Sequence, residues 1–137
     1  MVVLVDTNVL LDVISMREPY DENSIRVIEH CALRTVQGYI AVHSISNIYF
    51  ILRKIYTDAE RRKIILNYMK FLTVAGIGHE QMVEALNRDN FKDFEDCLQD
   101  ECAKEIKADY IITRNIKDFA HSKIPAVTPE QFLEVIA

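Results

Sequence analysis

The sequence contains no tryptophan, and it has only three residues each of glycine, proline and cysteine. So few glycines and prolines leave little room for flexible linkers or low-complexity tails. Cys31, Cys97 and Cys102 form no CxxC pair and lack zinc-finger spacing, which favours free thiols over a disulfide framework or a zinc site. No apolar run approaches the ~18 residues of a membrane span, and no basic segment precedes an apolar stretch. We therefore expect a cytoplasmic protein without a membrane partner.

The chain of 137 residues is long enough for one ordinary domain, and we expect a single domain over residues 1–137. Half of its residues are hydrophobic and 27% are charged, which is the balance of a globular protein. The formal net charge of −5 does not by itself indicate nucleic-acid binding. Two short basic runs, Arg53-Lys54 and Arg61-Arg62-Lys63, either form solvated helix faces or contact phosphate groups.

Strand-like apolar segments alternate with helical periodicity along the chain. Strands are expected at residues 2–5, 38–42, 71–77 and 110–113, with an edge strand at 126–127. Helices are expected at residues 7–17, 22–33, 44–55, 57–69, 80–86, 94–107 and 129–136. This alternation predicts an α/β layer fold with a mainly parallel sheet of four or five strands.

Polar side chains follow several of the predicted strands, where ligands of parallel α/β sheets bind. Asp6 comes directly after the first strand, and Asn47 lies in the first turn of the helix after the second. The segment TRNIKDF, residues 113–119, follows the strand at 110–113. Asp6 has no obvious structural partner, so we interpret it as a functional residue.

Three acids, Asp93, Asp96 and Asp100, open the long helix and fall within an arc of about 60° on it. They repel one another unless a cation or solvent relieves them. Aspartate and asparagine oxygens without converging histidine or cysteine suit Mg²⁺ or Mn²⁺ better than zinc. The alternative is that Asp93 and Asp96 only complement the helix dipole.

Other polar residues also have structural interpretations. Ser44 and Asn47 have the spacing of a helix-capping pair, and Thr113 or Asn115 could cap a turn. Asp12 is interpreted as a solvated or salt-bridged helix residue. These alternatives stay open at the level of the sequence.

Four stretches in the right order resemble a PIN domain, and in particular bacterial PIN proteins of the VapC toxin type. They are VLVDTNVLLDV, HSISNIYFILRK, DFEDCLQDECAKEIKADYIITRNIKDF and a short closing helix. The resemblance implies a three-layer α/β/α fold and a ribonuclease site that depends on Mg²⁺ or Mn²⁺. It also implies RNA as substrate, a homodimer and neutralisation by an antitoxin protein.

The resemblance also assigns residues to the site. Asp6 matches the first acidic position of the family and Asp96 the third, with Asp93 close by. Asn47 and Asn115 stand where the family usually has acids, and Asp118 is the carboxylate nearest to Asn115. The expected catalytic residues are Asp6, Asn47, Asp96 and Asn115, and the expected metal ligands are Asp6, Asp93 and Asp96. The expected supporting residues are Thr7, Asn8, Asp100, Thr113 and Asp118.

The resulting hypothesis is an endoribonuclease in which a metal-activated water attacks the phosphodiester, without a protein nucleophile. It would be the toxin of a toxin–antitoxin pair. The alternative is a catalytically weakened PIN domain that binds RNA or protein, because Asn47 and Asn115 bring no charge to the metal. A phosphatase- or receiver-type domain is disfavoured, because Asn8 stands where aspartyl phosphatases have their second acid and residues 71–77 contain no aspartate.

Overall fold

A five-stranded parallel sheet forms the centre of the molecule in the computed structural model, which describes all residues from Met1 to Ala137. The strand order is β3-β2-β1-β4-β5, and every neighbouring pair is parallel. The strands are β1 (Val2–Val5), β2 (Gln37–Ala41), β3 (Leu72–Ala75), β4 (Tyr110–Ile112) and β5 (Ala126–Val127). The expected α/β class and the five strands are confirmed.

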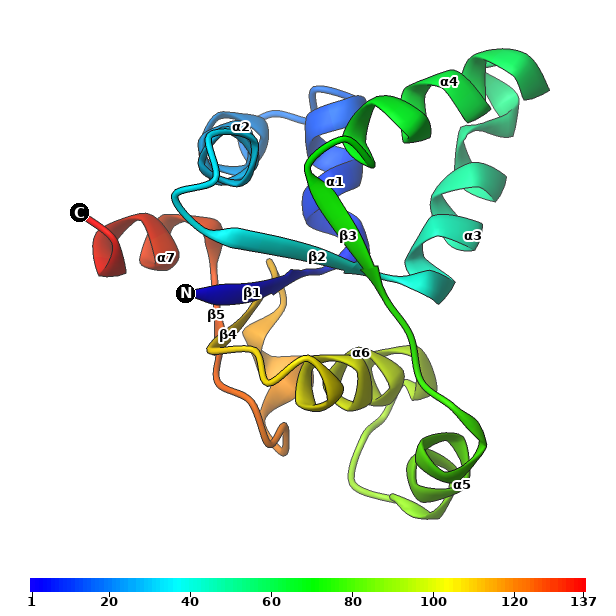
Figure 1. Cartoon of the computed structure of the whole chain (residues 1–137), viewed down its shortest axis with the longest axis vertical. Coiled ribbons are helices and arrows are strands. Elements are labelled where there is room, and N and C mark those ends of the chain that lie inside the picture. Colours follow the sequence, from blue (N-terminus) through cyan, green and yellow to red (C-terminus); the bar gives the residue numbers. More distant parts are fainter.

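Helices cover both faces of this sheet. Figure 1 shows α1 and α2 on one face and α6 on the other, with α5 outside α6. The α-helices are α1 (Thr7–Ile14), α2 (Asp21–Ala32), α3 (Val42–Ile51), α4 (Asp58–Tyr68), α5 (His79–Asn87), α6 (Phe94–Glu105) and α7 (Pro129–Val135). Two short 3₁₀ helices are η1 (Leu52–Lys54) and η2 (Ile116–Phe119). The three-layer α/β/α arrangement is therefore present, and no helix is long and apolar enough to cross a membrane.

Strand β1 lies in the middle of the core. Val3, Leu4 and Val5 have no exposed surface. Val3 and Val5 belong to the larger hydrophobic cluster with α1, α2 and α7, whereas Leu4 belongs to the smaller cluster with α6. Burial on both faces explains why the strand is a continuous apolar run rather than an alternating one.

Gly38 in β2 allows α2 to approach the sheet closely. A Cβ atom at this position would lie 2.6 Å from Cys31 Sγ and 2.8 Å from Leu72 Cδ2. The absent side chain thus sets the distance between helix and strand. Cys31, Cys97 and Cys102 are buried free thiols, as expected.

Three helices end on a residue in the left-handed region that is not glycine. These residues are Met16 after α1, Arg34 after α2 and Lys107 after α6, with φ of 50°, 62° and 54°. After each, the next backbone N–H donates back into the last turn, as Ala108 N does to Ala103 O. This Schellman arrangement ends α1 at Ile14, so the helix is shorter than the predicted 7–17.

The start of α3 differs from the sequence prediction for a different reason. The helix begins at Val42, directly after β2, and its N-cap Ala41 offers no side chain for capping. Ser44 is fully buried inside the helix, so its interpretation as a cap is wrong. By contrast, Thr57 and Glu60 form the predicted capping box of α4.

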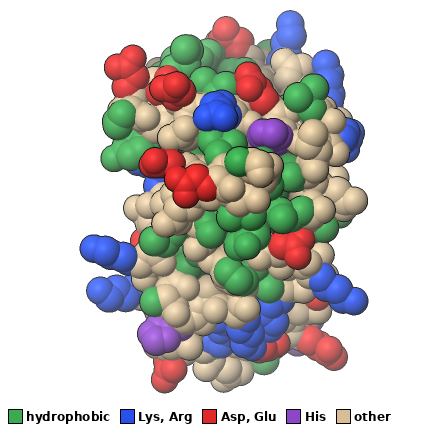
Figure 2. Space-filling view, turned by 90° about the vertical axis from the view of Figure 1, so that its left-hand side faces the viewer, with side chains coloured by type: hydrophobic (Ala, Val, Ile, Leu, Met, Phe, Trp, Pro, Cys, Tyr) green, Lys and Arg blue, Asp and Glu red, His purple; other side chains and the backbone are tan.

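The face of the molecule that carries α2 and α7 has a mixed surface. Figure 2 shows acidic and basic side chains interspersed there, with hydrophobic side chains across the middle of the face. This face therefore presents no broad field of one charge.

Candidate active site

Asp6 occupies the point where strand order reverses, between β1 and β4. Its Oδ1 accepts a hydrogen bond from Thr7 N at 2.8 Å and thereby caps α1. Its Oδ2 accepts one from Thr113 Oγ1, also at 2.8 Å. Sheets of this kind bind ligands at such a switch point, beyond the carboxyl ends of the strands.

The buried position of Asp6 raises the pKa of its carboxyl group, which is 5% exposed. The hydrogen bonds from Thr113 and Thr7 and the charge of Arg114 act against this increase, whereas Asp118 adds to it. The fixed orientation of Asp6 therefore comes from two hydrogen bonds that stabilise its anion.

A cavity of about 370 Å³ opens at this edge of the sheet. It receives side chains from α1, α3, the start of α6 and the segment after β4. Its lining is Asp6, Thr7, Asn8, Asn47, Phe50, Ile51, Asp93, Glu95, Asp96, Gln99, Asn115 and Asp118. Every expected site residue except Thr113 and Asp100 lines this cavity. Thr113 does not line it but donates a hydrogen bond to Asp6.

Asp96, like Asp6, is an acid of the cavity whose pKa is raised. Burial is the largest cause that raises its pKa to about 7, and the charges of Asp6, Asp93, Asp118 and Glu95 raise it further. No lysine, arginine or histidine lines the cavity to offset these acids. Without a cation, Asp96 therefore keeps its proton to a much higher pH than an ordinary aspartate.

Asp93 combines both roles that the sequence left open. It is the N-cap of α6, and its Oδ1 accepts a hydrogen bond from Glu95 N at 2.8 Å. The same side chain lines the cavity. The capping bond fixes where Asp93 stands relative to Asp96 one turn further on.

Ser44 and Gln99 are two site residues that the sequence analysis missed. Thr7 Oγ1 donates to Ser44 Oγ at 2.6 Å, and Gln99 Nε2 donates to the same oxygen at 2.7 Å. These bonds join α1, α3 and α6 beneath the cavity. The one signal in the sequence was a glutamine within an otherwise apolar helix stripe, where a buried amide needs a partner.

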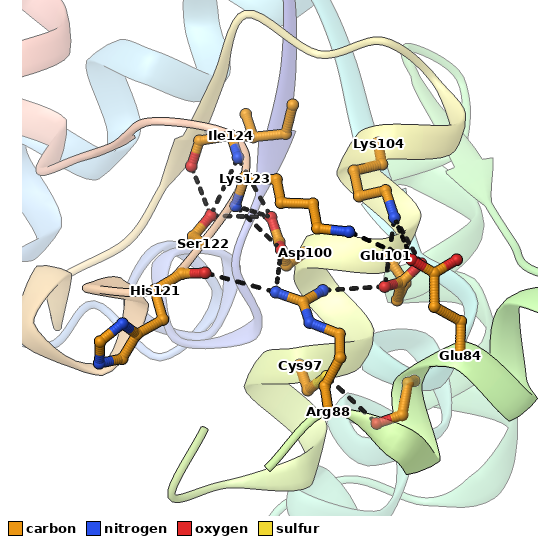
Figure 3. A network of polar contacts seen from close by, with 11 residues as sticks. Glu84, Arg88, Cys97, Asp100, Glu101, Lys104, His121, Ser122, Lys123 and Ile124 are labelled. Atoms are coloured by element: carbon orange, nitrogen blue, oxygen red, sulfur yellow. Dashed lines mark hydrogen bonds and ion pairs between the residues drawn. The ribbon is translucent and has the colours of Figure 1, made fainter. Parts of the chain in front are cut away.

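Asp100 lies outside the cavity, which corrects its expected supporting role. Figure 3 shows that it points toward Arg88 and residues 122–124. Its Oδ2 accepts from Arg88 Nη2 at 2.7 Å, and its Oδ1 accepts from Ser122 Oγ at 2.8 Å. Asp100 does lie on the same side of α6 as Asp96. One turn further along the helix, however, it faces different chain segments.

Asp12 is salt-bridged rather than solvated. Its side chain is fully buried, and Oδ2 lies 2.8 Å from Arg114 Nε, while Oδ1 lies 3.9 Å from an Arg17 nitrogen. Burial raises the pKa of Asp12, and the two arginines act against this. The ion pair ties α1 to the segment after β4, which supplies Thr113 and Asn115 to the site.

The basic runs have different surroundings. The Arg53 guanidinium lies 3.7 Å from the ring centroid of Phe50, which lines the cavity. Arg61 of α4 stacks on Tyr49 of α3, whereas Arg62 forms an ion pair with Asp58 within α4. Of the two basic runs, the one with Arg53 therefore contacts a residue that lines the cavity.

The donor set fits a hard divalent cation. The cavity offers carboxylate and amide oxygens, and Gln99 Oε1 is buried without a hydrogen-bond partner. No three Asp, Glu, His or Cys side chains form a group that could hold a metal by themselves. Mg²⁺ needs no such group, because it is often held by one or two carboxylates, waters and substrate phosphates.

Comparison with known proteins agrees with the fold that carries this cavity. The family model of the PIN domain matches residues 2–117. No curated protein matches the sequence significantly.

Several solved structures share the fold. A toxin–antitoxin complex from Klebsiella pneumoniae has a TM-score of 0.69 and 25% identity, with 93% of this chain and 97% of that chain covered. VapBC2 from Rickettsia felis, bound to a DNA fragment from its promoter, has a TM-score of 0.69 and 15% identity, covering 93% and 98%. VapC20 from Mycobacterium tuberculosis, a toxin that cleaves the sarcin-ricin loop, has a TM-score of 0.62 and 12% identity, covering 80% and 86%. At the identities of the last two, the likeness shows the fold alone.

Proposed function

This chain belongs to the PIN domain family, a family of nucleases, and from this premise we propose that it is a Mg²⁺- or Mn²⁺-dependent endoribonuclease that hydrolyses single-stranded or loop RNA. One observation carries the proposal. Asp6, Asp93, Asp96 and Asp118 converge on a single cavity that no cationic side chain lines. Such a cavity favours a divalent cation together with an anionic phosphate ligand.

Asp6 and Asp96 are the residues that would hold the cation, with Asp93 as a further ligand. Asn47 and Asn115 would add neutral oxygens, so the ion is held less tightly than by four acids. When bound, Mg²⁺ or Mn²⁺ supplies an activated water and offsets the charge that develops on the phosphate. Thr113 keeps Asp6 oriented through the bond to Oδ2.

Water is the attacking group in this proposal. No serine, cysteine, histidine or lysine lines the cavity. The only lining hydroxyl is that of Thr7, which already donates to Ser44. We assign the amide of Asn8, the next residue, to positioning the phosphate, and Thr7 to the hydrogen bonds beneath the cavity.

Cleavage of a mixed RNA substrate with Mn²⁺ tests the proposal. Asp6→Asn and Asp96→Asn should each lower the rate by about 100-fold, because each removes a charge from the cation site. Asp89→Asn, an exposed acid outside the cavity, is the matched control and should cleave like wild type. Cleavage that survives in both site variants would rule out this assignment.

The second candidate function is a binding module with a weakened catalytic site, which the neutral side chains of Asn47 and Asn115 favour. A thermal-shift titration with Mn²⁺ separates the two. An enzyme should gain stability at millimolar Mn²⁺. Asn47→Glu should increase that gain, because a carboxylate replaces a neutral oxygen. No gain in wild type together with a gain in Asn47→Glu would favour the binding module.

We further propose an antitoxin as protein partner, as in the toxin–antitoxin complexes that share the fold. Between α3, α4 and β3 lies a mostly apolar groove of about 590 Å³. Its residue Leu66 is 65% exposed, and Val42 and Val74 are also exposed. Apolar surface of this kind marks a contact with another protein.

Co-purification with the product of a short adjacent reading frame tests this partner. Leu66→Glu should weaken the complex, whereas Leu33→Glu, an exposed leucine at the end of α2, should not. The homodimer and the cytoplasmic location stay predictions, and light scattering of the purified chain checks the first.

A further inference from the structure

A second cavity of about 370 Å³ lies beside the candidate active site on the same edge of the sheet. Arg114, which lines it, stands between Thr113, the partner of Asp6, and Asn115, which lines the first cavity. Thr128, on its other side, directly follows β5. Neighbouring parallel strands are roughly 5 Å apart, so a chain bound at the end of β1 can continue into a cavity at the ends of β4 and β5.

An aromatic ring and a guanidinium form one wall of this cavity. Tyr20 is 47% exposed, and the Arg114 guanidinium lies 4.2 Å from the centroid of its ring. Asp12 holds Arg114 from the buried side at 2.8 Å. Two planar groups are therefore fixed next to open space, which is the arrangement on which unpaired bases stack.

The charges of the cavity favour a base over a bare phosphate. Asp12 already offsets the charge of Arg114, and Glu130 adds a negative charge to the lining. A phosphate would therefore meet no cationic side chain whose charge is not already offset. A neutral base is not repelled by these negative charges, and the N–H groups on its edge can donate hydrogen bonds to a carboxylate.

Polar groups are available for the edge of a base. Asn23 lines the cavity with an amide that both donates and accepts. Thr128 Oγ1 accepts from Gln131 N, which leaves its hydroxyl hydrogen free to donate. Recognition of a single-stranded base requires planar groups for stacking and hydrogen-bond donors and acceptors beside them.

We propose that the cavity lined by Tyr20, Asn23, Arg114, Thr128 and Glu130, the Tyr20 subsite, binds an unpaired base of the RNA strand next to the cleaved phosphodiester. The inference rests on the proposed ribonuclease function and adds to it a determinant of substrate choice. It makes Tyr20 a specificity residue that takes no part in the chemistry.

Equilibrium binding without catalysis tests the subsite. The probes are a fluorescein-labelled octauridylate and a strand of equal length with ribose and phosphate but no bases, both measured in EDTA at low salt. Wild type should bind the strand with bases more tightly. Tyr20→Ala should weaken binding of that strand by about tenfold and leave the abasic strand unchanged.

Further variants separate stacking from folding. Tyr20→Phe keeps the ring and should bind like wild type, and Leu86→Ala, an exposed residue on α5, is the distant control. Asn23→Trp, which fills the cavity with a larger side chain, should reproduce the defect of Tyr20→Ala. Ultraviolet crosslinking of an octamer that contains 4-thiouridine should label the peptide around Tyr20.

The outcomes distinguish this inference from the function on which it rests. If RNA binds but Tyr20→Ala weakens both strands equally, or neither, the subsite is wrong and the ribonuclease proposal stands. If wild type neither binds nor crosslinks either strand, the subsite is wrong, and the ribonuclease proposal fails with it only if the cleavage assay with Mn²⁺ is also negative.

Discussion

Asp6 and Asp96 face the same cavity, but their partners differ. Asp6 accepts hydrogen bonds from Thr7 N and Thr113 Oγ1, which favour its anion. Burial, together with the charges of four nearby acids, raises the pKa of Asp96 to about 7. Under the proposed function, Asp96 is therefore a position at which a proton and the metal cation would compete.

The pH dependence of stability should reveal this competition. In the folded chain Asp96 keeps its proton up to a pH of about 7, whereas its ordinary pKa is 3.8. The folded state thus binds more protons in this range, and metal-free wild type loses stability as the pH rises from about 4 to about 7. Asp96→Asn cannot ionise, so we expect it to be more stable than wild type at pH 8 by about 1 kcal/mol, after allowance for solvent screening.

Thermal melts in EDTA at about pH 5 and pH 8 measure the effect, where 1 kcal/mol corresponds to roughly 4 °C. Asp89→Asn keeps Asp96, so its stability should fall with rising pH in the same way as that of wild type. A constant difference between Asp96→Asn and wild type at both pH values would contradict the assigned repulsion.

At this scale the sequence located the acids but not the residues beneath them. Asp6 and Asn47 could be placed because parallel strands end at one edge, whereas Asp96 was placed by its helical arc and by the resemblance to PIN domains. The hydrogen bonds of Ser44 with Thr7 and Gln99 could not be predicted, because they join side chains from three different helices. Helical angles alone grouped Asp100 with Asp96, although the chain segment over Asp100 decides its partners.

At the scale of the elements, the types of helix and strand were predicted and their ends were not. The strands followed from apolar runs and the helices from periodicity. Helix α1 stops early because Met16 turns into the left-handed region, a conformation that sequence patterns assign to glycine. With three glycines in the chain, none stands at these helix ends.

Glycine at one of these ends should stabilise the fold. Lys107 follows α6 with φ of 54° and an exposed side chain, so little but backbone strain changes on substitution. Lys107→Gly should increase the free energy of unfolding by about 1 kcal/mol. Lys107→Ala keeps the Cβ atom and should gain nothing, and urea denaturation compares the two. An equal gain in both variants would show that the lysine side chain, and not the backbone, is responsible.

At the scale of the whole molecule, charge limits how RNA binds. The net charge is −5, and acids surround the cavity. Figure 2 shows a face with both signs of charge rather than a basic surface. We therefore expect RNA to be held by few phosphate contacts, by the proposed cation and by stacking.

The salt dependence of RNA affinity should accordingly be shallow. Each phosphate contact contributes a slope of about −0.7 to a plot of log K against log salt for single strands. We expect a total slope between about −1 and −2, and Arg53→Gln should reduce its size by about 0.7. Arg26→Gln, on the exposed side of α2, is the control. Fluorescence anisotropy at several KCl concentrations gives the slopes, and a value near −5 would show that a basic surface has been overlooked.

We propose that residues 1–137 form a single domain, because β1 contributes side chains to both hydrophobic clusters. Neither cluster is complete without this strand. Urea transitions followed by circular dichroism and by tyrosine fluorescence should therefore coincide.

The hydrogen bond from Thr113 to Asp6 joins residues that are 107 positions apart in the chain. During translation, Asp6 leaves the ribosome long before β4 and Thr113 exist to hold it. At about 5–20 residues per second, several seconds pass in which a nascent chain carries the first acid but no site. If the cavity cuts RNA as proposed, a centre built in this way is assembled last, and the ribosome that makes the protein is not exposed to it until synthesis is nearly finished.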